Sequence, residues 1–128
     1  GEGLDTLKLL GADQQLDLSA LGNKIQSMEV IDITGSGNNT LTLRAGEVLE
    51  NASQNLFHDN GFNQMMVKGD AGDKVNLSDL LPNDIDPGNW TNGGTVNVGG
   101  VEYQSFQMDS LNTEILVQMG VTVTLQNH

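Results

Sequence analysis

The chain has no cysteine, and few of its 128 residues are aromatic or basic. Without cysteine, neither disulfide bonds nor thiolate-bound metals can stabilise the fold. Five basic residues stand against 17 acidic ones, which gives a formal net charge of -12. This charge repels nucleic acid and anionic lipid, and it favours a bound cation that reduces the repulsion between carboxylates. We therefore expect no nucleic-acid partner.

Long apolar runs are absent as well. No segment approaches the ~20 apolar residues of a membrane span, so we expect no direct membrane insertion. No signal peptide precedes Gly1, and we expect the chain to be a module of a larger protein. Only two prolines accompany 16 glycines and many Asn and Asp residues. This composition is typical of short strands joined by tight turns, and it predicts a single all-β domain over residues 1–128, which we expect to be a monomer.

Alternating apolar residues occur in three strand-turn-strand units. Their first and second strands begin, in order, at Leu7 and Leu16, at Ile31 and Leu41, and at Met65 and Val75. Successive first strands are 24 and 34 residues apart, and successive second strands 25 and 34. Since the first and second strands advance by nearly equal steps from unit to unit, we predict a β-roll or solenoid in which each unit adds one strand to each of two facing sheets. A β-sandwich of similar hairpins is the alternative.

A proline-containing loop leads to Trp90 and divides the domain into the units of residues 1–81 and closing strands at 88–128. Gly99-Gly100 stands between two alternating apolar segments, which predicts a hairpin with a two-residue turn. Further strands are expected at 114–117 and 121–125. We predict that the closing strands form an antiparallel meander that covers one end of the sheets.

Acidic residues in glycine-rich turns are the candidate metal ligands. Calcium binds six to eight oxygens from carboxylates, carbonyls and amides, which turns of this kind supply. Asp70 and Asp73 lie in the turn Gly69-Asp70-Ala71-Gly72-Asp73, and Asp5 lies directly before the first strand. Asp32 alternates with Ile31 and Ile33, so it faces away from the core, where it can reach the ion of a neighbouring turn. We predict calcium as the cofactor with these four aspartates as ligands; second-rank candidates are Asp13, Asp17, Asn38 and Asn39.

Other chemistry has weaker support. Ordinary turn formers and solvated acids are the alternative interpretation of the aspartates. The acidic loop over residues 79–86 does not have the spacing of an EF-hand, and His58 and His128 share no zinc-ligand spacing. His58 has no accompanying Ser and acid constellation, so we predict that the protein is not an enzyme. Trp90 fits a core anchor better than a platform for carbohydrate.

The segments 1–7, 31–43 and 67–77, together with the region from Trp90 onward, resemble a calcium-binding module of giant bacterial repeats-in-toxin (RTX) adhesins. The module it resembles is called a split domain because a sugar-binding domain sometimes interrupts it. The nonapeptide Gly-Gly-x-Gly-x-Asp-x-U-x of that family is present only in degraded form. The resemblance implies type I secretion, an extracellular location at the bacterial cell surface, and a role in cell adhesion and biofilm formation.

The expected function is thus that of a non-catalytic, calcium-binding structural module. It would space or scaffold the ligand-binding domains of a secreted adhesin, with adjacent domains of the same adhesin as its partners. The alternative is that the module itself binds a cell-surface glycan or peptide through the loop from Pro82 to Trp90. An exposed Trp90 would favour this alternative, and a buried Trp90 would count against it.

Overall fold

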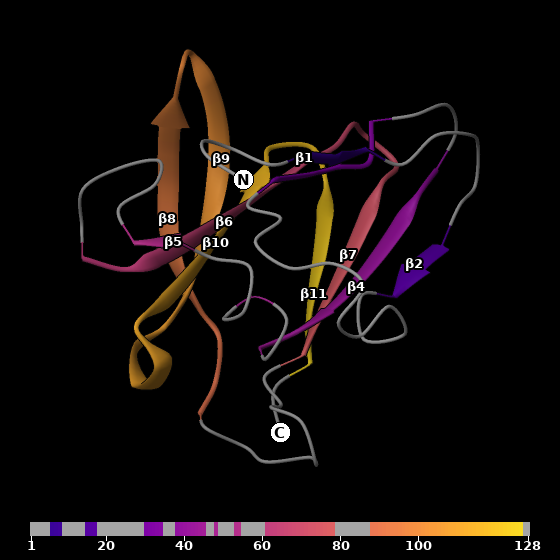
Figure 1. The fold of residues 1–128 in the computed structure, drawn as a ribbon. Coiled ribbons are helices and arrows are strands. Elements are labelled where there is room, and N and C mark those ends of the chain that lie inside the picture. The colour runs from indigo at the N-terminus through magenta and orange to yellow at the C-terminus, as the bar shows by residue number, and fades with distance from the viewer. Residues whose placement is uncertain are drawn as a thin grey trace.

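The computed structural model describes residues 6–8, 15–17, 30–34, 38–45, 48, 53–54, 61–78 and 88–126. These residues form two β-sheets (Figure 1). The strands are β1 (Thr6–Lys8), β2 (Gln15–Asp17), β3 (Val30–Asp32), β4 (Thr40–Arg44), β5 (Ser53–Gln54), β6 (Asn63–Lys68), β7 (Lys74–Ser78), β8 (Thr91–Val98), β9 (Val101–Met108), β10 (Thr113–Gln118) and β11 (Thr122–Gln126). A 3-10 helix, η4 (Asp109–Leu111), joins β9 to β10.

Sheet A has the strand order β1-β3-β6-β10-β9-β8, with β5 beside the start of β6, and sheet B has the order β11-β7-β4-β2. Every described pair in sheet B is parallel, and so are the pairs that join β1, β3, β6 and β10 in sheet A. The prediction of an all-β fold is confirmed, with two sheets as expected of a sandwich.

Equivalent strands of successive units lie side by side. The chain runs from β3 in sheet A to β4 in sheet B, and it repeats this crossing from β6 to β7 and from β10 to β11. Ile31 pairs with Val67, and Leu41 pairs with Val75, so the apolar positions of the units align across the sheets. The nearly equal steps of the first and second strands in the sequence are therefore matched by aligned apolar positions in both sheets.

The closing strands agree with the prediction only in part. Strands β8, β9 and β10 form an antiparallel meander, as expected. Gly99 and Gly100, with φ of +60° and +87°, occupy the two-residue turn between β8 and β9. The expectation that residues 121–125 continue this meander is wrong, because β11 leaves sheet A and pairs in parallel with β7. The turn after Gln118 crosses between the sheets, which lets Val123 and Leu125 cover the same core as the equivalent apolar residues of β7.

One hydrophobic core fills the space between the two sheets. Sheet A contributes Ile31, Val67 and Ile115 to it, and sheet B contributes Leu41 and Leu77. All five side chains are fully buried. Alternation along each strand places these residues on the inner faces of the sheets. None of the described segments forms a helix that is long and apolar enough to cross a membrane.

The outer face of sheet A, which is turned away from sheet B, is apolar in its middle. Val30, Met66, Tyr103 and Leu116 form a second buried cluster there, and Val96 and Val98 of the β8–β9 hairpin pack against it. Sheet A is therefore apolar on both faces, while polar residues flank its outer cluster along the strands.

Candidate functional site

The turn between β6 and β7 is built around the carboxylate of Asp73, which is fully buried. Its Oδ2 accepts a hydrogen bond from the backbone N–H of Asp70 (2.7 Å), and its Oδ1 accepts one from the backbone N–H of Asn39 (2.8 Å). The backbone N–H of Asp73 donates to the carbonyl of Asp70 (3.0 Å). One carboxylate therefore closes its own turn and binds the neighbouring turn before β4.

The same turn is held from its other side by the segment that joins β10 to β11. The side-chain oxygen of Gln118 accepts a hydrogen bond from the N–H of Gly69 (3.1 Å). The carbonyl of Asp73 accepts one from the N–H of Thr122 (3.0 Å). A Cβ at Gly69 would lie 2.6 Å from a methyl group of Val121. The two crossings can therefore approach this closely only because residue 69 is glycine. Three successive crossings between the sheets thus form one connected layer.

Further oxygens border this layer. Asn39 is fully buried, and its side-chain N–H donates to the carbonyl of Ile33 (3.1 Å). The side-chain oxygen of Asn38 lies where a Cβ on Gly72 would be, and Gly72 has φ of +95°. The side chain of Asp70 is exposed beside them. The turn layer therefore contains two aspartates, an amide oxygen and several carbonyls, and these are the ligand types that calcium prefers.

Asp32 lies apart from this layer, on the outer face of sheet A. Its Oδ1 accepts hydrogen bonds from the backbone N–H (2.9 Å) and the hydroxyl (2.5 Å) of Thr34. In register, Asp32 lies between Lys8 of β1 and Lys68 of β6. Asp32 therefore bonds within its own strand, on the face of sheet A that is turned away from the core.

The remaining predicted ligands are placed as follows. Asp5 and Asp13 lie outside the described residues, and Asp17 lies exposed on β2. No three His, Cys, Asp or Glu side chains come together in the described part of the chain. Of the four aspartates predicted as ligands, the structure brings Asp70 and Asp73 together in one turn.

Trp90 is buried at the start of β8, with 1% of its surface exposed. Its indole N–H donates to the carbonyl of Ser78 at the end of β7 (2.9 Å). The ring thereby spans the core from sheet A to sheet B. The prediction that Trp90 anchors the core is confirmed, and its burial counts against its use as a platform for a glycan.

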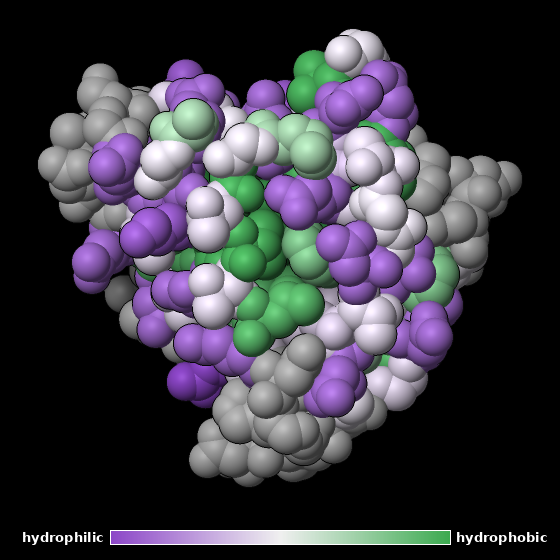
Figure 2. Space-filling model, turned by 180° about the vertical axis from the view of Figure 1, so that it is seen from behind, coloured by the Kyte–Doolittle hydropathy of each residue, from purple (hydrophilic) through white to green (hydrophobic). Residues whose placement is uncertain are grey.

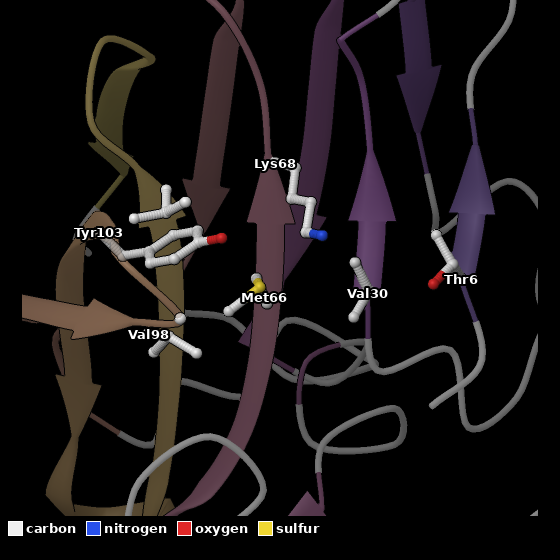
Figure 3. Close-up of a pocket in the computed structure, with 8 residues that line it drawn as sticks. Thr6, Val30, Met66, Lys68, Val98 and Tyr103 are labelled. Carbon is white, nitrogen blue, oxygen red and sulfur yellow. The ribbon is translucent and has the colours of Figure 1, made fainter. Parts of the chain in front are cut away.

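A cavity of about 340 Å³ opens on the outer face of sheet A. It lies between the middle of the sheet and the tip of the β8–β9 hairpin, and Figure 3 shows its lining. The residues that line it are Thr6, Val30, Met66, Lys68, Val98, Gly99, Val101 and Tyr103. Burial raises the pKa of the Tyr103 phenol above its usual value of 10.0. The cavity combines an apolar floor with a few polar groups, which is typical of small-ligand sites.

A buried carboxylate on the same outer face lies farther along β10. Glu114 is fully buried and accepts hydrogen bonds from the side chains of Gln64 (3.3 Å), Gln107 (3.2 Å) and Ser105. Gln64, Glu114 and Gln107 are in register on β6, β10 and β9. Uncharged side chains from both neighbouring strands therefore replace the water that this carboxyl group would otherwise bind.

Figure 2 shows the molecule from behind, where apolar side chains gather in a hollow that polar side chains surround. A group of apolar side chains at a hollow indicates a surface that can bind a ligand or a partner, whereas single apolar side chains at the surface are ordinary.

Sequence reasoning missed both Lys68 and Tyr103 as members of a site. The signal for Lys68 was present, since it alternates with the apolar Met66 and so shares its face of the strand. The contribution of Tyr103 depends on how the hairpin lies against sheet A, which no local pattern reveals.

Comparison of the chain with protein-family models, with curated proteins and with solved structures finds no match.

Proposed function

We propose that the protein is a non-catalytic, calcium-stabilised structural module of a secreted bacterial RTX adhesin. It spaces or scaffolds the ligand-binding domains of that adhesin during cell adhesion and biofilm formation. The observation that carries the structural part of this proposal is the buried Asp73 carboxylate, which links successive crossings between the sheets. The adhesin assignment is supported by the sequence resemblance.

The strand arrangement supports a roll-like module. Parallel pairing of β3 with β6 and of β4 with β7 is the arrangement in which each unit adds one strand to either sheet. Such a fold transmits load from unit to unit along its axis, which suits a spacer between neighbouring domains. The module acts as a monomer at the bacterial surface, after export by type I secretion.

The residues of the turn layer fit calcium in their chemistry. Asp73 and Asp70 would supply the carboxylate oxygens, and the side chains of Asn38 and Asn39, with nearby carbonyls, would supply neutral ones. A divalent cation there would also offset part of the net charge of -12. Asp32 is not required, because it lies in a row with Lys8 and Lys68 on the outer face of sheet A.

A thermal melt of the chelator-treated protein, followed by circular dichroism, tests this proposal. Calcium at ten times its dissociation constant should stabilise the fold by about 1.4 kcal/mol and raise Tm by about 5 °C, while magnesium should have little effect. Asp73→Asn and Asp70→Asn should each abolish this shift. Asp109→Asn, at the opposite end of β10, makes the same charge change on an exposed residue and should retain it.

Asp70→Asn keeps the test decisive if Asp73→Asn fails to fold, because the Asp70 side chain is exposed and can be changed without disturbing the core. An unchanged melt on addition of calcium, or a shift that survives in both variants, would contradict the assignment of this turn to calcium. Equal stabilisation by magnesium would show a general charge effect instead of a site.

A further inference from the structure

We propose that the cavity on the outer face of sheet A binds a small molecule that joins an apolar body to a single carboxylate. The volume of about 340 Å³ lies at the lower end of the range for small-ligand sites. This inference goes beyond the proposed structural role, and it uses residues that take no part in the turn layer.

The apolar body would rest on the middle of sheet A. Val30 and Met66 form the floor of the cavity, in register on β3 and β6. Val98 and Val101, from the two strands of the β8–β9 hairpin, form the opposite wall. In Figure 3, Met66 lies between the hairpin residue Val98 and Val30 of β3. An aliphatic chain in this space would remove from water the apolar area that the half-buried Val98 and the exposed Val101 still present.

Three polar groups border this apolar space. Lys68 extends from β6 with its ammonium directed toward Met66 and Val30, and the hydroxyl of Tyr103 points toward the same strand (Figure 3). Thr6 on β1 presents its hydroxyl from the other side (Figure 3). All three can donate a hydrogen bond, and Lys68 adds a positive charge. A carboxylate accepts such donors with both of its oxygens, and an ammonium cannot accept any.

The charge of this surface differs from that of the rest of the molecule. Lys8 and Lys68 are two of only five basic residues, and both lie in one row of sheet A. The acid between them, Asp32, directs its Oδ1 to Thr34 along its own strand. Within the described residues, Lys68 forms no ion pair. This locally positive row in a strongly acidic protein favours an anionic ligand over a cationic one.

Isothermal titration calorimetry with octanoate, 1-octanol and octylammonium tests the proposal on the intact protein. The three probes share one aliphatic chain and differ in the charge of their head group. We expect saturable binding of octanoate with one molecule per chain, and binding of 1-octanol and octylammonium at least about tenfold weaker, since a charge-assisted hydrogen bond is lost.

Variants locate the site. Lys68→Met should weaken octanoate binding about tenfold, whereas Lys74→Met, which removes an exposed lysine of sheet B, should leave it unchanged. Val101→Asp places a negative charge at the exposed wall of the cavity and should weaken octanoate more than 1-octanol. Val101 has 38% of its surface exposed, so this variant should fold normally.

Three results would overturn the proposal: no saturable binding of octanoate, equal binding of 1-octanol, or equal loss in the Lys68 and Lys74 variants. Each titration is made both with and without chelator, so that octanoate binding is measured separately from any effect of calcium. Failure here would leave the turn layer and its melt unaffected.

Discussion

Tyr103 is the only tyrosine of the chain, and its ring is buried in the apolar cluster on the outer face of sheet A. Burial raises the pKa of its phenol above the usual value of 10.0, because the charged phenolate would lose its hydration. The protonated phenol is therefore favoured by the folded state more than by the unfolded state. Its contribution to stability is complete below the unfolded pKa and is lost as pH rises through the folded pKa.

A spectrophotometric titration of tyrosinate should show this shift directly. We expect the midpoint in the folded protein to lie above that in urea-unfolded protein, and the free energy of unfolding to fall as the pH rises above ~10. Tyr103→Phe should reduce this alkaline loss, because it removes the group that ionises. Equal midpoints in folded and unfolded protein would show that the phenol is hydrated and that the outer cluster is open.

The sequence revealed part of the environment of Asp73. A glycine-rich turn with an aspartate was visible, and so was its position directly before β7. The bond from Asn39 to Asp73 was not, because the two residues are 34 positions apart and meet only when the sheets form. The sequence therefore identified a polar, oxygen-rich turn, while the structure shows that backbone N–H groups bind both oxygens of its central carboxylate.

At the scale of an element, two glycines with similar positive φ differ in the space around them. Comparing alanine variants at the two positions therefore distinguishes the free energy lost to backbone strain from that lost to a close contact. Gly72 has φ of +95° and would place a Cβ against the side-chain oxygen of Asn38. Gly94, in the irregular part of β8, has φ of +99° and has open space where a Cβ would be. Both conformations are unfavourable for residues with a side chain.

Alanine at each of these glycines should therefore destabilise the protein by different amounts. Gly94→Ala should cost about 1–2 kcal/mol from backbone strain alone. Gly72→Ala should cost about 0.5–1.5 kcal/mol more, because the Asn38 side chain must change its conformation to make room for the methyl group. Urea denaturation of both variants gives the two free energies. Equal losses would show that the turns before β4 and β7 are not packed against each other.

The sequence predicted the elements better than their partners. Alternating apolar residues located strands β3, β4, β6 and β7, and Gly99-Gly100 located the hairpin. The error lies in β11, because a short turn containing Gly120 between two apolar segments is also the pattern of a hairpin. Pairing with β7 depends on a register between strands about fifty residues apart, and local alternation carries no information about it.

At the scale of the whole molecule, both sheets share one core. Residues of β3, β6 and β10 face residues of β4 and β7 across it. The Trp90 indole, at the start of β8, donates to the carbonyl of Ser78 at the end of β7 and so joins the two sheets directly. The outer cavity is also a property of this scale, since its lining comes from β1, β3, β6 and the β8–β9 hairpin. No local pattern in the sequence could have predicted it.

Because neither sheet can bury its inner face alone, the described domain should unfold in a single cooperative transition. Trp90 is the only tryptophan, so its fluorescence reports on the core, while far-ultraviolet circular dichroism reports on both sheets. We expect the two urea denaturation curves to coincide. Trp90→Phe should lower the free energy of unfolding by about 2–4 kcal/mol, because it removes both indole volume and a buried hydrogen bond, and its circular dichroism should still show one transition. Curves with separate midpoints would contradict the shared core, because they would mean that one sheet persists after the other has unfolded.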